Sequence, residues 1–213
     1  SSVEEYMLKS DFFNPNIFTE YSKTPDSGHY FKVLAGFQSE LYKQRDMTGY
    51  QAGIMSGIPT LNTTQFDATV SGGYSEWATV GFFGRLNYDY KGRYLAEVNM
   101  RYDGTSRFLR NNRWNLFPSF SLGWNIAREA FFEDFTDVIG NLKLRGSWGQ
   151  LGNQNTDNWY PFYQTMNITA NGGKWLVNGV KPNISSEPAL VSSLLTWEKT
   201  ETMNIGLDLG MLN

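Results

Sequence analysis

The sequence predicts an all-β fold, an antiparallel sheet of about seven or eight strands that forms a segment of a transmembrane β-barrel. Apolar and polar residues alternate along much of the chain, as they do in strands with one apolar and one polar face. Aromatic residues make up 16% of the 213 residues, and charged residues make up only 18%, against roughly 25% in ordinary domains. The connections between predicted strands alternate between short and long, which is typical of barrels with short periplasmic turns and long extracellular loops.

The clearest predicted strands form a pair at 82–90 and 94–102, joined by Lys91-Gly92, a two-residue hairpin signal. Further strands are predicted, in chain order, at 12–23 (a weaker candidate), 31–41, 115–126, 142–148 and 202–209. Ten residues on the apolar face are expected to contact lipid: Phe82, Leu86, Tyr94, Ala96, Val98, Met100, Leu122, Trp124, Ile205 and Leu207.

If the strands run up and down as a meander, all the short connections fall at one end of the sheet. The short connections are 24–29, 91–92 and 128–140, and the longer ones are 44–76, 104–112 and 152–195. Segment 159–168 is a candidate extra strand, which fits this alternation only if it pairs within its own loop, for example with 174–180. A short helical signal lies at 127–135. Pro15 and Pro118 are expected at bulges or edges, because proline donates no ladder hydrogen bond.

A soluble β-sandwich that binds carbohydrate is the alternative interpretation, because its strands also alternate around a shared core. Three features favour the barrel: a densely polar second face, loops that differ in length between the two ends, and aromatic residues at strand ends, as Tyr88, Tyr90 and Tyr94 are. About seven strands is an odd number, whereas single-chain bacterial barrels have even numbers and lipid does not tolerate open edges. We therefore expect the sequence to be part of a longer barrel.

The composition excludes several kinds of functional site. The sequence has no cysteine and one histidine, which excludes a Cys-ligated zinc site, a multi-His metal site and a thiol nucleophile. The single histidine, His29, lies in a predicted turn and is expected to be a turn residue. The net charge of −3 indicates no nucleic-acid partner. The sequence has no apolar run long enough to predict a transmembrane helix. We expect no catalytic residue, no metal and no cofactor, and a barrel enzyme is the weakest interpretation.

A series of short motifs begins near residue 81 and continues to the end of the sequence. In order, they are Asp103-Gly104-Thr105-Ser106-Arg107-Phe108, Asn112-Arg113-Trp114, Phe117-Pro118-Ser119, Gly123-Trp124-Asn125-Ile126, Glu129-Ala130-Phe131-Phe132, Leu142-Lys143-Leu144-Arg145-Gly146-Ser147-Trp148-Gly149-Gln150, Gly152-Asn153-Gln154, Leu195-Thr196-Trp197-Glu198-Lys199-Thr200 and Asn204-Ile205-Gly206-Leu207-Asp208. In this order and spacing they resemble the β-barrel of SusC-type TonB-dependent outer-membrane transporters of the Bacteroidetes. The resemblance is moderate at 28–38 and weak at 1–27 and 44–76.

The resemblance implies a barrel of about 22 strands filled by an N-terminal plug domain, with 1–213 forming part of the barrel and the plug lying outside these residues. It implies energised uptake of nutrients, oligosaccharides or peptides, across the outer membrane of a Gram-negative bacterium. The implied partners are a SusD-like surface lipoprotein, the TonB complex acting through the plug, the cargo and outer-membrane lipid.

Two loops carry candidate cargo contacts. The long loop contains Trp159, Tyr160, Tyr163 and Trp175, whose amphipathic rings suit substrate recognition; the alternative is that they pack the loop on itself. The polar loop at 103–113 is expected to have a structural role, because Asp-Gly favours a tight turn and Ser, Thr and Asn bond local backbone.

Six charged residues are predicted to line the barrel interior: Arg85, Glu97, Arg101, Lys143, Arg145 and Asp208. Opposite charges on neighbouring strands are expected to pair. A wall of ion pairs that holds a plug is favoured over a transport path.

Overall fold

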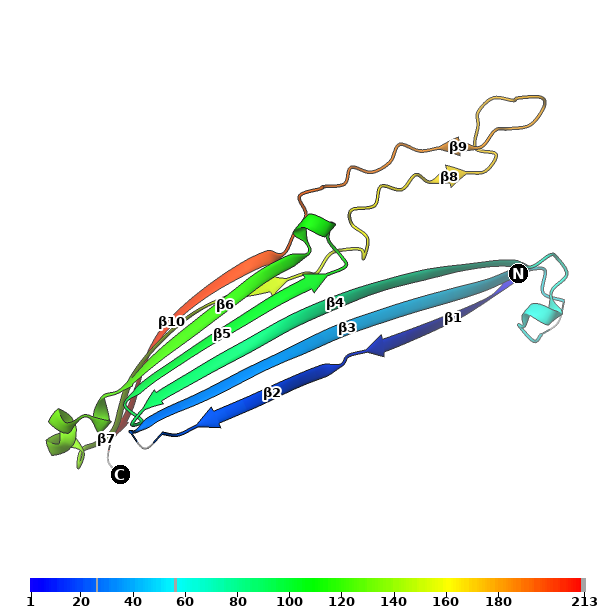
Figure 1. The fold of residues 1–213 in the computed structure, drawn as a ribbon. Coiled ribbons are helices and arrows are strands. Elements are labelled where there is room, and N and C mark those ends of the chain that lie inside the picture. Colours follow the sequence, from blue (N-terminus) through cyan, green and yellow to red (C-terminus); the bar gives the residue numbers. More distant parts are fainter. Residues whose placement is uncertain (26, 56, 212–213) are drawn as a thin grey trace.

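The chain forms one curved antiparallel β-sheet in a computed structural model that describes residues 1–25, 27–55 and 57–211 (Figure 1). Eight strands belong to this sheet: β1 (Ser2–Phe13), β2 (Asn16–Lys23), β3 (His29–Ala52), β4 (Thr69–Tyr90), β5 (Tyr94–Thr105), β6 (Trp114–Asn125), β7 (Ile139–Asn153) and β10 (Glu198–Met211). Their order is β1-β3-β4-β5-β6-β7-β10, with β2 paired to β3 alongside β1. The predicted all-β class and meander are confirmed.

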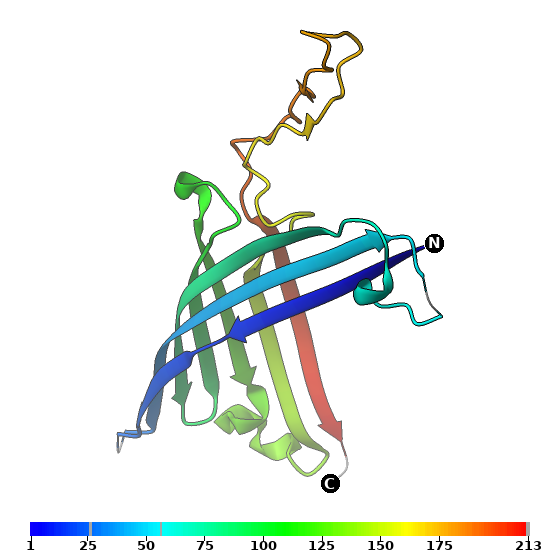
Figure 2. The same cartoon turned by 90° about the vertical axis from the view of Figure 1, so that its right-hand side faces the viewer.

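The sheet is curved like part of a barrel wall, and it does not close on itself within the described residues (Figure 2). A sandwich would need a second large sheet packed on the first. Among the described residues the only other sheet is the two-stranded pair β8 (Ile168–Thr169) and β9 (Ile184–Ser185). The alternative interpretation as a β-sandwich is therefore wrong.

Pro15 and Pro118, the two prolines inside predicted strands, lie where a hydrogen-bonded ladder ends. β1 and β2 form one edge of the sheet, interrupted at Asn14 and Pro15, and the Pro15 carbonyl accepts a hydrogen bond from Ser39 N at 3.0 Å. Pro118 lies inside β6, and the pairing of β6 with β7 begins at the next residue, Ser119. The missing N–H of each proline is thus placed at an edge or at the end of a ladder, as predicted.

Two strands are longer than predicted. β3 has 24 residues and β4 has 22, and they stay paired far beyond the ends of β5 and β6 (Figure 1). The predicted connection at 44–76 is therefore wrong, because only 53–68 lies between the two strands. Alternation does not mark the extension, because each face mixes polar and apolar residues: Arg45 and Met47 share one face, and Asp46 lies on the other.

The longest connection, 154–197, projects away from the sheet (Figures 1 and 2). The predicted strand at 159–168 is not formed, since its aromatic residues pack through ring contacts instead. The pairing within this loop joins β8 to β9, and an isolated bridge joins Val177 to Val180. Because this pairing stays inside the loop, the meander is preserved. The connection lengths alternate except at β6–β7, where 126–138 is longer than 106–113 between β5 and β6.

The short connections lie together at the opposite end of the sheet from the long loop. Lys91 and Gly92 both have positive φ, 53° and 66°, as the central residues of a type I′ turn do, and Arg93 N donates to Tyr90 O at 2.9 Å. The predicted hairpin is present, but its loop has three residues, 91–93, because Tyr90 pairs with Tyr94. The helical signal at 127–135 is confirmed as two short 3-10 helices, η3 (Ile126–Arg128) and η4 (Ala130–Phe135). No helix among the described residues is long and apolar enough to cross a membrane.

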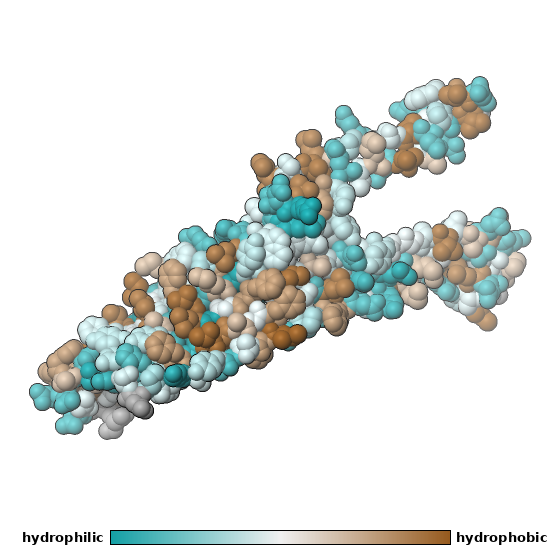
Figure 3. Space-filling model, in the orientation of Figure 1, coloured by the Kyte–Doolittle hydropathy of each residue, from teal (hydrophilic) through white to brown (hydrophobic). Residues whose placement is uncertain are grey.

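The register places all ten predicted lipid-facing residues on one face, the convex face of the sheet. For example, Val98 lies opposite Leu86 on one side and Phe120 on the other, and Ala96 lies opposite Leu122. No layer of protein covers these side chains among the described residues: Leu122 exposes 67% of its surface. Figure 3 shows apolar side chains gathered over the middle of the sheet, with hydrophilic side chains toward its ends.

The turn between β6 and β7 is fastened to the sheet through one carboxylate. Glu129 accepts a hydrogen bond from Trp124 Nε1 at 3.0 Å and pairs with Arg93 at 3.5 Å. The hydrogen bonds from Trp124 and Tyr94 lower the pKa of Glu129, because they stabilise the ionised form. Glu129 therefore links this turn to the start of β5, through Arg93 and Tyr94, and to the end of β6, through Trp124.

We expect Glu129 to stabilise the fold at neutral pH and to lose this effect in acid. Because its pKa is lowered in the folded state, the stabilisation is present above the ordinary pKa of glutamate, roughly 4.3, and is lost as pH falls through the lowered value. The apparent melting temperature of a full-length receptor in detergent should therefore fall on Glu129→Gln at pH 7, and the difference should narrow toward pH 3. A difference that is unchanged across this range would contradict the assignment.

Candidate functional site

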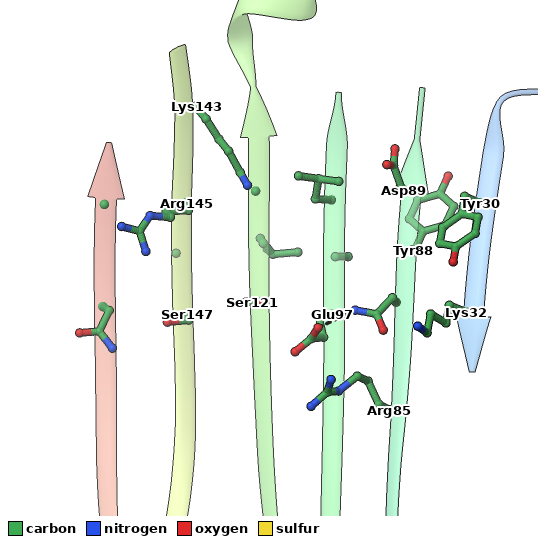
Figure 4. A pocket seen from close by; sticks show the side chains of 18 of the residues that line it. Tyr30, Lys32, Arg85, Tyr88, Asp89, Glu97, Ser121, Lys143, Arg145 and Ser147 are labelled. Carbon is green, nitrogen blue, oxygen red and sulfur yellow. Dashed lines mark hydrogen bonds between the residues drawn. The ribbon is translucent and has the colours of Figure 1, made fainter. Parts of the chain in front are cut away.

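The polar face of the sheet is concave, and its hollows include one near the short turns and one near the long loop. The first, here called the turn-side hollow, has a volume of about 880 Å³ and is lined by side chains from neighbouring strands (Figure 4). Its charged lining includes Lys32, Arg85, Glu97, Lys143 and Arg145. These residues alternate along their strands with the convex-face residues, so one register produces both the apolar face and the charged hollow.

A hydrogen-bonded chain fixes the centre of the turn-side hollow. Arg85 Nε donates to Asn99 Oδ1 at 2.6 Å, and Asn99 Nδ2 donates to Glu97 Oε1 at 2.8 Å. Asn87 Nδ2 donates to the second oxygen of Glu97 at 2.5 Å. Both carboxylate oxygens of Glu97 are thus engaged by amides from β4 and β5, which holds its side chain in place.

Ion pairs occur across this face, as predicted, but not at every charged residue. Arg145 pairs with Asp208 of β10 at 3.3 Å, and Arg101 pairs with Asp103 of its own strand at 2.8 Å. The side chain of Lys143 forms neither an ion pair nor a hydrogen bond with the residues that the structure describes. The wall therefore presents at least one free cation to whatever occupies its concave side.

The second hollow, here called the loop-side hollow, lies on the same face closer to the long loop and has a volume of about 590 Å³. Side chains with amide groups dominate its polar lining: Gln38, Asn99, Gln150, Asn153, Gln154 and Asn155. Arg101, which also lines it, is held by Asp103 and by Gln38 Oε1. The loop-side hollow is thus polar, and its lining includes the carboxylate of Glu40, which accepts a hydrogen bond from Thr79 Oγ1 and forms no ion pair with a described residue.

The wall of the loop-side hollow is supported by a small aromatic core. Phe108, Phe117 and Trp197 are each at least nine-tenths buried and meet edge to face, with Trp197 at 5.3 Å from the Phe117 ring and 5.8 Å from the Phe108 ring. Trp197 Nε1 also donates to the Arg113 carbonyl at 2.7 Å. This core joins the loop after β5 to the start of β10, so the motifs at 103–108 and 195–200 fold against each other.

The loop after β5 also anchors the returning end of the long loop. Asn112 Nδ2 donates to the carbonyls of Ser193 and Leu195 at 3.0 and 3.2 Å, and Thr196 Oγ1 donates to the Asn112 carbonyl. Thr105 and Arg107 are buried here, and the Arg107 guanidinium lies over the Trp77 ring at 5.1 Å. Burial lowers the pKa of Arg107, because it removes water from the charged form. These contacts agree with the structural role expected for 103–113.

The four predicted cargo-contacting aromatic residues do not form one site. Trp159 packs edge-on against Tyr42 of β3, and the Tyr160 hydroxyl accepts a hydrogen bond from Glu76 N at 2.8 Å. Tyr163 contacts the Tyr160 ring, whereas Trp175 lies between β8 and β9 at the far end of the loop (Figure 1). Contact of these residues with cargo stays a prediction, and three of them also pack the base of the loop.

Sequence reasoning missed the amide lining of the loop-side hollow and the aromatic pair beside it. Tyr42 and Trp77 stack at 6.0 Å on β3 and β4, at the limits of the segment predicted to be a loop. The signal in the sequence for this lining is the run Gly152-Asn153-Gln154, which places two amide side chains at the end of a strand. His29, by contrast, lies at the turn end as expected, with Nδ1 at 2.9 Å from the Tyr88 hydroxyl.

The described residues contain no cluster of His, Cys, Asp or Glu side chains that could hold a metal ion. A convex apolar face, a polar concave face and loops of unequal length at the two ends together define a segment of an outer-membrane β-barrel wall. The sequence matches the family described as "TonB dependent receptor-like, beta-barrel" over residues 5–213. The chain belongs to this family, whose members are receptors and transporters of the outer membrane of Gram-negative bacteria.

Individual relatives agree with this assignment. The chain is 35% identical to the TonB-dependent receptor SusC of Bacteroides thetaiotaomicron over 202 residues, which is 93% of the chain and 19% of SusC. It is 34% identical to the TonB-dependent receptor P26 of Formosa agariphila over 79% of the chain and 16% of that receptor. The chain thus spans about a fifth of the length of the curated relatives that it matches.

The fold is also that of a solved structure. The RagAB peptide transporter superposes on 99% of the chain with a TM-score of 0.83 and 22% identity, and the chain covers 23% of the matched chain. The same transporter in its "open-open" state superposes with a TM-score of 0.82. The curved sheet is therefore a segment of a large barrel of known architecture.

The close approach of Phe117 to Gly152 makes the aromatic core sensitive to one methyl group. A Cβ at Gly152 would collide with the Phe117 ring, which cannot move away because Trp197 packs against it. We expect Gly152→Ala to destabilise the full-length receptor by about 1–3 kcal/mol, measured as a fall in its apparent melting temperature in detergent. Gly146→Ala on the same strand is the control, since its Cβ would meet only Asn204 O at 3.9 Å. Equal effects of the two substitutions would contradict the packing described.

Proposed function

We propose that residues 1–213 form part of the barrel domain of a TonB-dependent transporter that imports a nutrient, an oligosaccharide or a peptide, through the outer membrane. Membership of the receptor family carries this proposal, together with the opposite chemistry of the two faces of the sheet. The chain's own contribution is mechanical: a wall that contacts lipid on one side and the transport machinery on the other. It has no catalytic role in this proposal.

The convex face is the proposed lipid contact. Ile205, Leu207 and Leu122 expose 74%, 60% and 67% of their surface, and they lie on β10 and β6, the two strands that flank β7, on one continuous apolar face. Exposing so many large apolar side chains to water would be costly for a soluble protein, whereas lipid accepts them. Tyr94 and Trp124 lie opposite each other near the turn end, where an interfacial aromatic girdle would lie.

The turn-side hollow is the proposed seat of a plug domain supplied by the same polypeptide. Its lining contains both acids and bases, with Glu97 and Arg145 held by hydrogen bonds or ion pairs and the Lys143 side chain left free. Charged side chains in fixed positions suit a plug domain that must be held in place and then released. Contacts between charged groups are specific, but water can replace them. The TonB complex would act through that plug, outside the residues of this chain.

The long loop is the proposed contact with a SusD-like surface lipoprotein and with cargo. Its tip exposes large apolar residues, including Trp175 at 59%, and Leu190 is 99% exposed. SusC and the RagAB transporter are relatives in sequence and in fold, and the name of the latter includes a peptide as cargo. The proposed cargo is therefore an oligosaccharide or a peptide.

A pair of arginine substitutions on opposite faces tests the lipid contact. Val98→Arg should destabilise the full-length receptor by about 2–4 kcal/mol, because it places a charge on the lipid side of the sheet. Ser121→Arg, one row away on the concave face and opposite Glu97, should cost less than about 1 kcal/mol. Unfolding by urea in lipid vesicles measures both. Equal costs would mean that the convex face does not contact lipid.

A further inference from the structure

We propose that the turn end of the sheet, where its short connections lie together, binds an anionic phospholipid, with Lys91 and Arg128 as the ligands of its phosphate. The short connections of outer-membrane barrels face the periplasm, so this lipid belongs to the periplasmic leaflet. The inference rests on the proposed lipid contact of the convex face, because lipid headgroups lie where such a face ends. It goes further by assigning one class of lipid and two of its ligands to one place on the rim of the wall.

Main-chain hydrogen bonds join the turns at this end into one continuous rim. Lys91 N donates to the Gly28 carbonyl at 2.8 Å, which links the turn before β3 to the hairpin between β4 and β5. Asn125 N donates to the Arg93 carbonyl at 2.7 Å, which links the same hairpin to the end of β6. Figure 2 shows these turns at one end of the sheet. The side chains of the rim therefore project from a backbone that is held in place.

Lys91 and Arg128 each lie against a glycine of the rim. A Cβ at Gly28 would lie 2.6 Å from Lys91 Cγ, and a Cβ at Gly92 would overlap the Arg128 guanidinium. Both glycines have positive φ, 82° and 66°, which also disfavours a larger residue at either position. The two cationic side chains thus occupy space that the glycines leave open. Packing of this kind restricts their rotamers before a ligand binds, so less entropy is lost on binding.

Both cations lack a counter-ion within the part of the chain that the structure describes. Their side chains are exposed and form no ion pair there. The carboxylates beside them are engaged elsewhere, Glu129 in the contacts described above and Asp89 as the acceptor of a hydrogen bond from Gly92 N at 2.6 Å. The other acids of the turn between β6 and β7 form no ion pair with either cation. Two uncompensated positive charges favour a ligand with a net negative charge.

Aromatic rings continue from these cations onto the convex face. Lys91 Nζ lies 5.3 Å from the centre of the Tyr90 ring, and Tyr90 stacks on Tyr94 with ring centres 6.4 Å apart. Tyr94 lies opposite Trp124, and aliphatic side chains such as Leu86 follow toward the middle of the sheet. Charge, aromatic ring and aliphatic side chain thus follow one another as phosphate, glycerol and acyl chain do in a phospholipid.

An anionic phospholipid fits this arrangement better than a free anion or a zwitterionic lipid. Inorganic phosphate would neutralise the cations but would make no use of the adjacent rings. A zwitterionic headgroup brings a cation of its own, which leaves positive charge uncompensated at the site. An anionic phospholipid supplies both the negative charge and the acyl chains, so it accounts for the whole arrangement.

The test is a titration of the full-length receptor in a neutral detergent with short-chain phosphatidylglycerol, in which native mass spectrometry counts the bound lipids. Lys91→Gln and Arg128→Gln should each weaken binding of the first lipid about fivefold, and the double variant about 25-fold, because each removes one cation from the headgroup site. Lys91→Arg keeps the charge and should stay within about threefold of the wild type. Lys43→Gln is the control, since Lys43 lies on the convex face near the opposite end of β3, and it should change the affinity less than about twofold.

The outcomes separate this inference from its alternatives. Because both cations are exposed and unpaired among the described residues, the variants should melt at the wild-type temperature without lipid. Wild-type affinity in the double variant, an equal loss in Lys43→Gln, or equal binding of phosphatidylethanolamine would each overturn the inference. Competition by inorganic phosphate at the same concentration as the lipid would also overturn it, because the site would then be one for a free anion.

The proposed function is tested separately by TonB-dependent uptake in cells. Wild-type uptake together with a failure of the lipid titration would overturn this inference and leave the proposed function standing. Lipid binding that depends on Lys91 and Arg128 in a receptor that imports nothing would support this inference and remove the proposed function.

Discussion

Antiparallel pairing in a register that holds through the middle of the sheet is the constraint on which the rest of this structure depends. Across the membrane each backbone N–H and C=O must find a partner in the sheet, because lipid offers none. Once that pairing is fixed, successive side chains must point to opposite faces. The row Leu86, Val98, Phe120 therefore faces outward, while the next row, with Glu97 and Ser121, faces inward. Apolar wall and polar interior are two consequences of the same hydrogen bonds.

Beyond the ends of β5, β6 and β10 that lie near the long loop, side-chain packing rather than strand pairing determines the structure. The loop after β5 and the start of β10 are far apart in the sequence, and Phe108, Phe117 and Trp197 bring them together as a small buried core. This core fixes the side of the loop-side hollow and, through Asn112, the return of the long loop. The sheet thus carries a rigid polar surface beside the aromatic core, although the loops beyond it are long.

The features that follow from strand register could be predicted from the sequence, whereas the features that depend on side-chain packing could not. Alternation located β5, β6, β7 and β10, and Lys91-Gly92 located the hairpin, because those signals are local. β3 continues to Ala52 and β4 begins at Thr69, and these extensions stay paired without an alternation of apolar and polar residues. The sequence pattern therefore could not predict them. The amide hollow was missed because Gln38, Asn99 and Gln154 lie on three separate segments, and only the sheet order brings them together. The contacts of Trp159 and Tyr160 depend on loop packing in the same way.

The most direct test of the central claim is a spin-label scan along β5 of the full-length receptor in lipid vesicles. Residues 1–213 contain no cysteine, so single cysteines can be introduced from Leu95 to Arg101 without a background from this segment. Collision with oxygen, which dissolves in lipid, should be highest at positions 96, 98 and 100. Collision with a water-soluble nickel complex should be higher at 97, 99 and 101 than at those positions. Collision frequencies that do not alternate with a period of two would contradict the account.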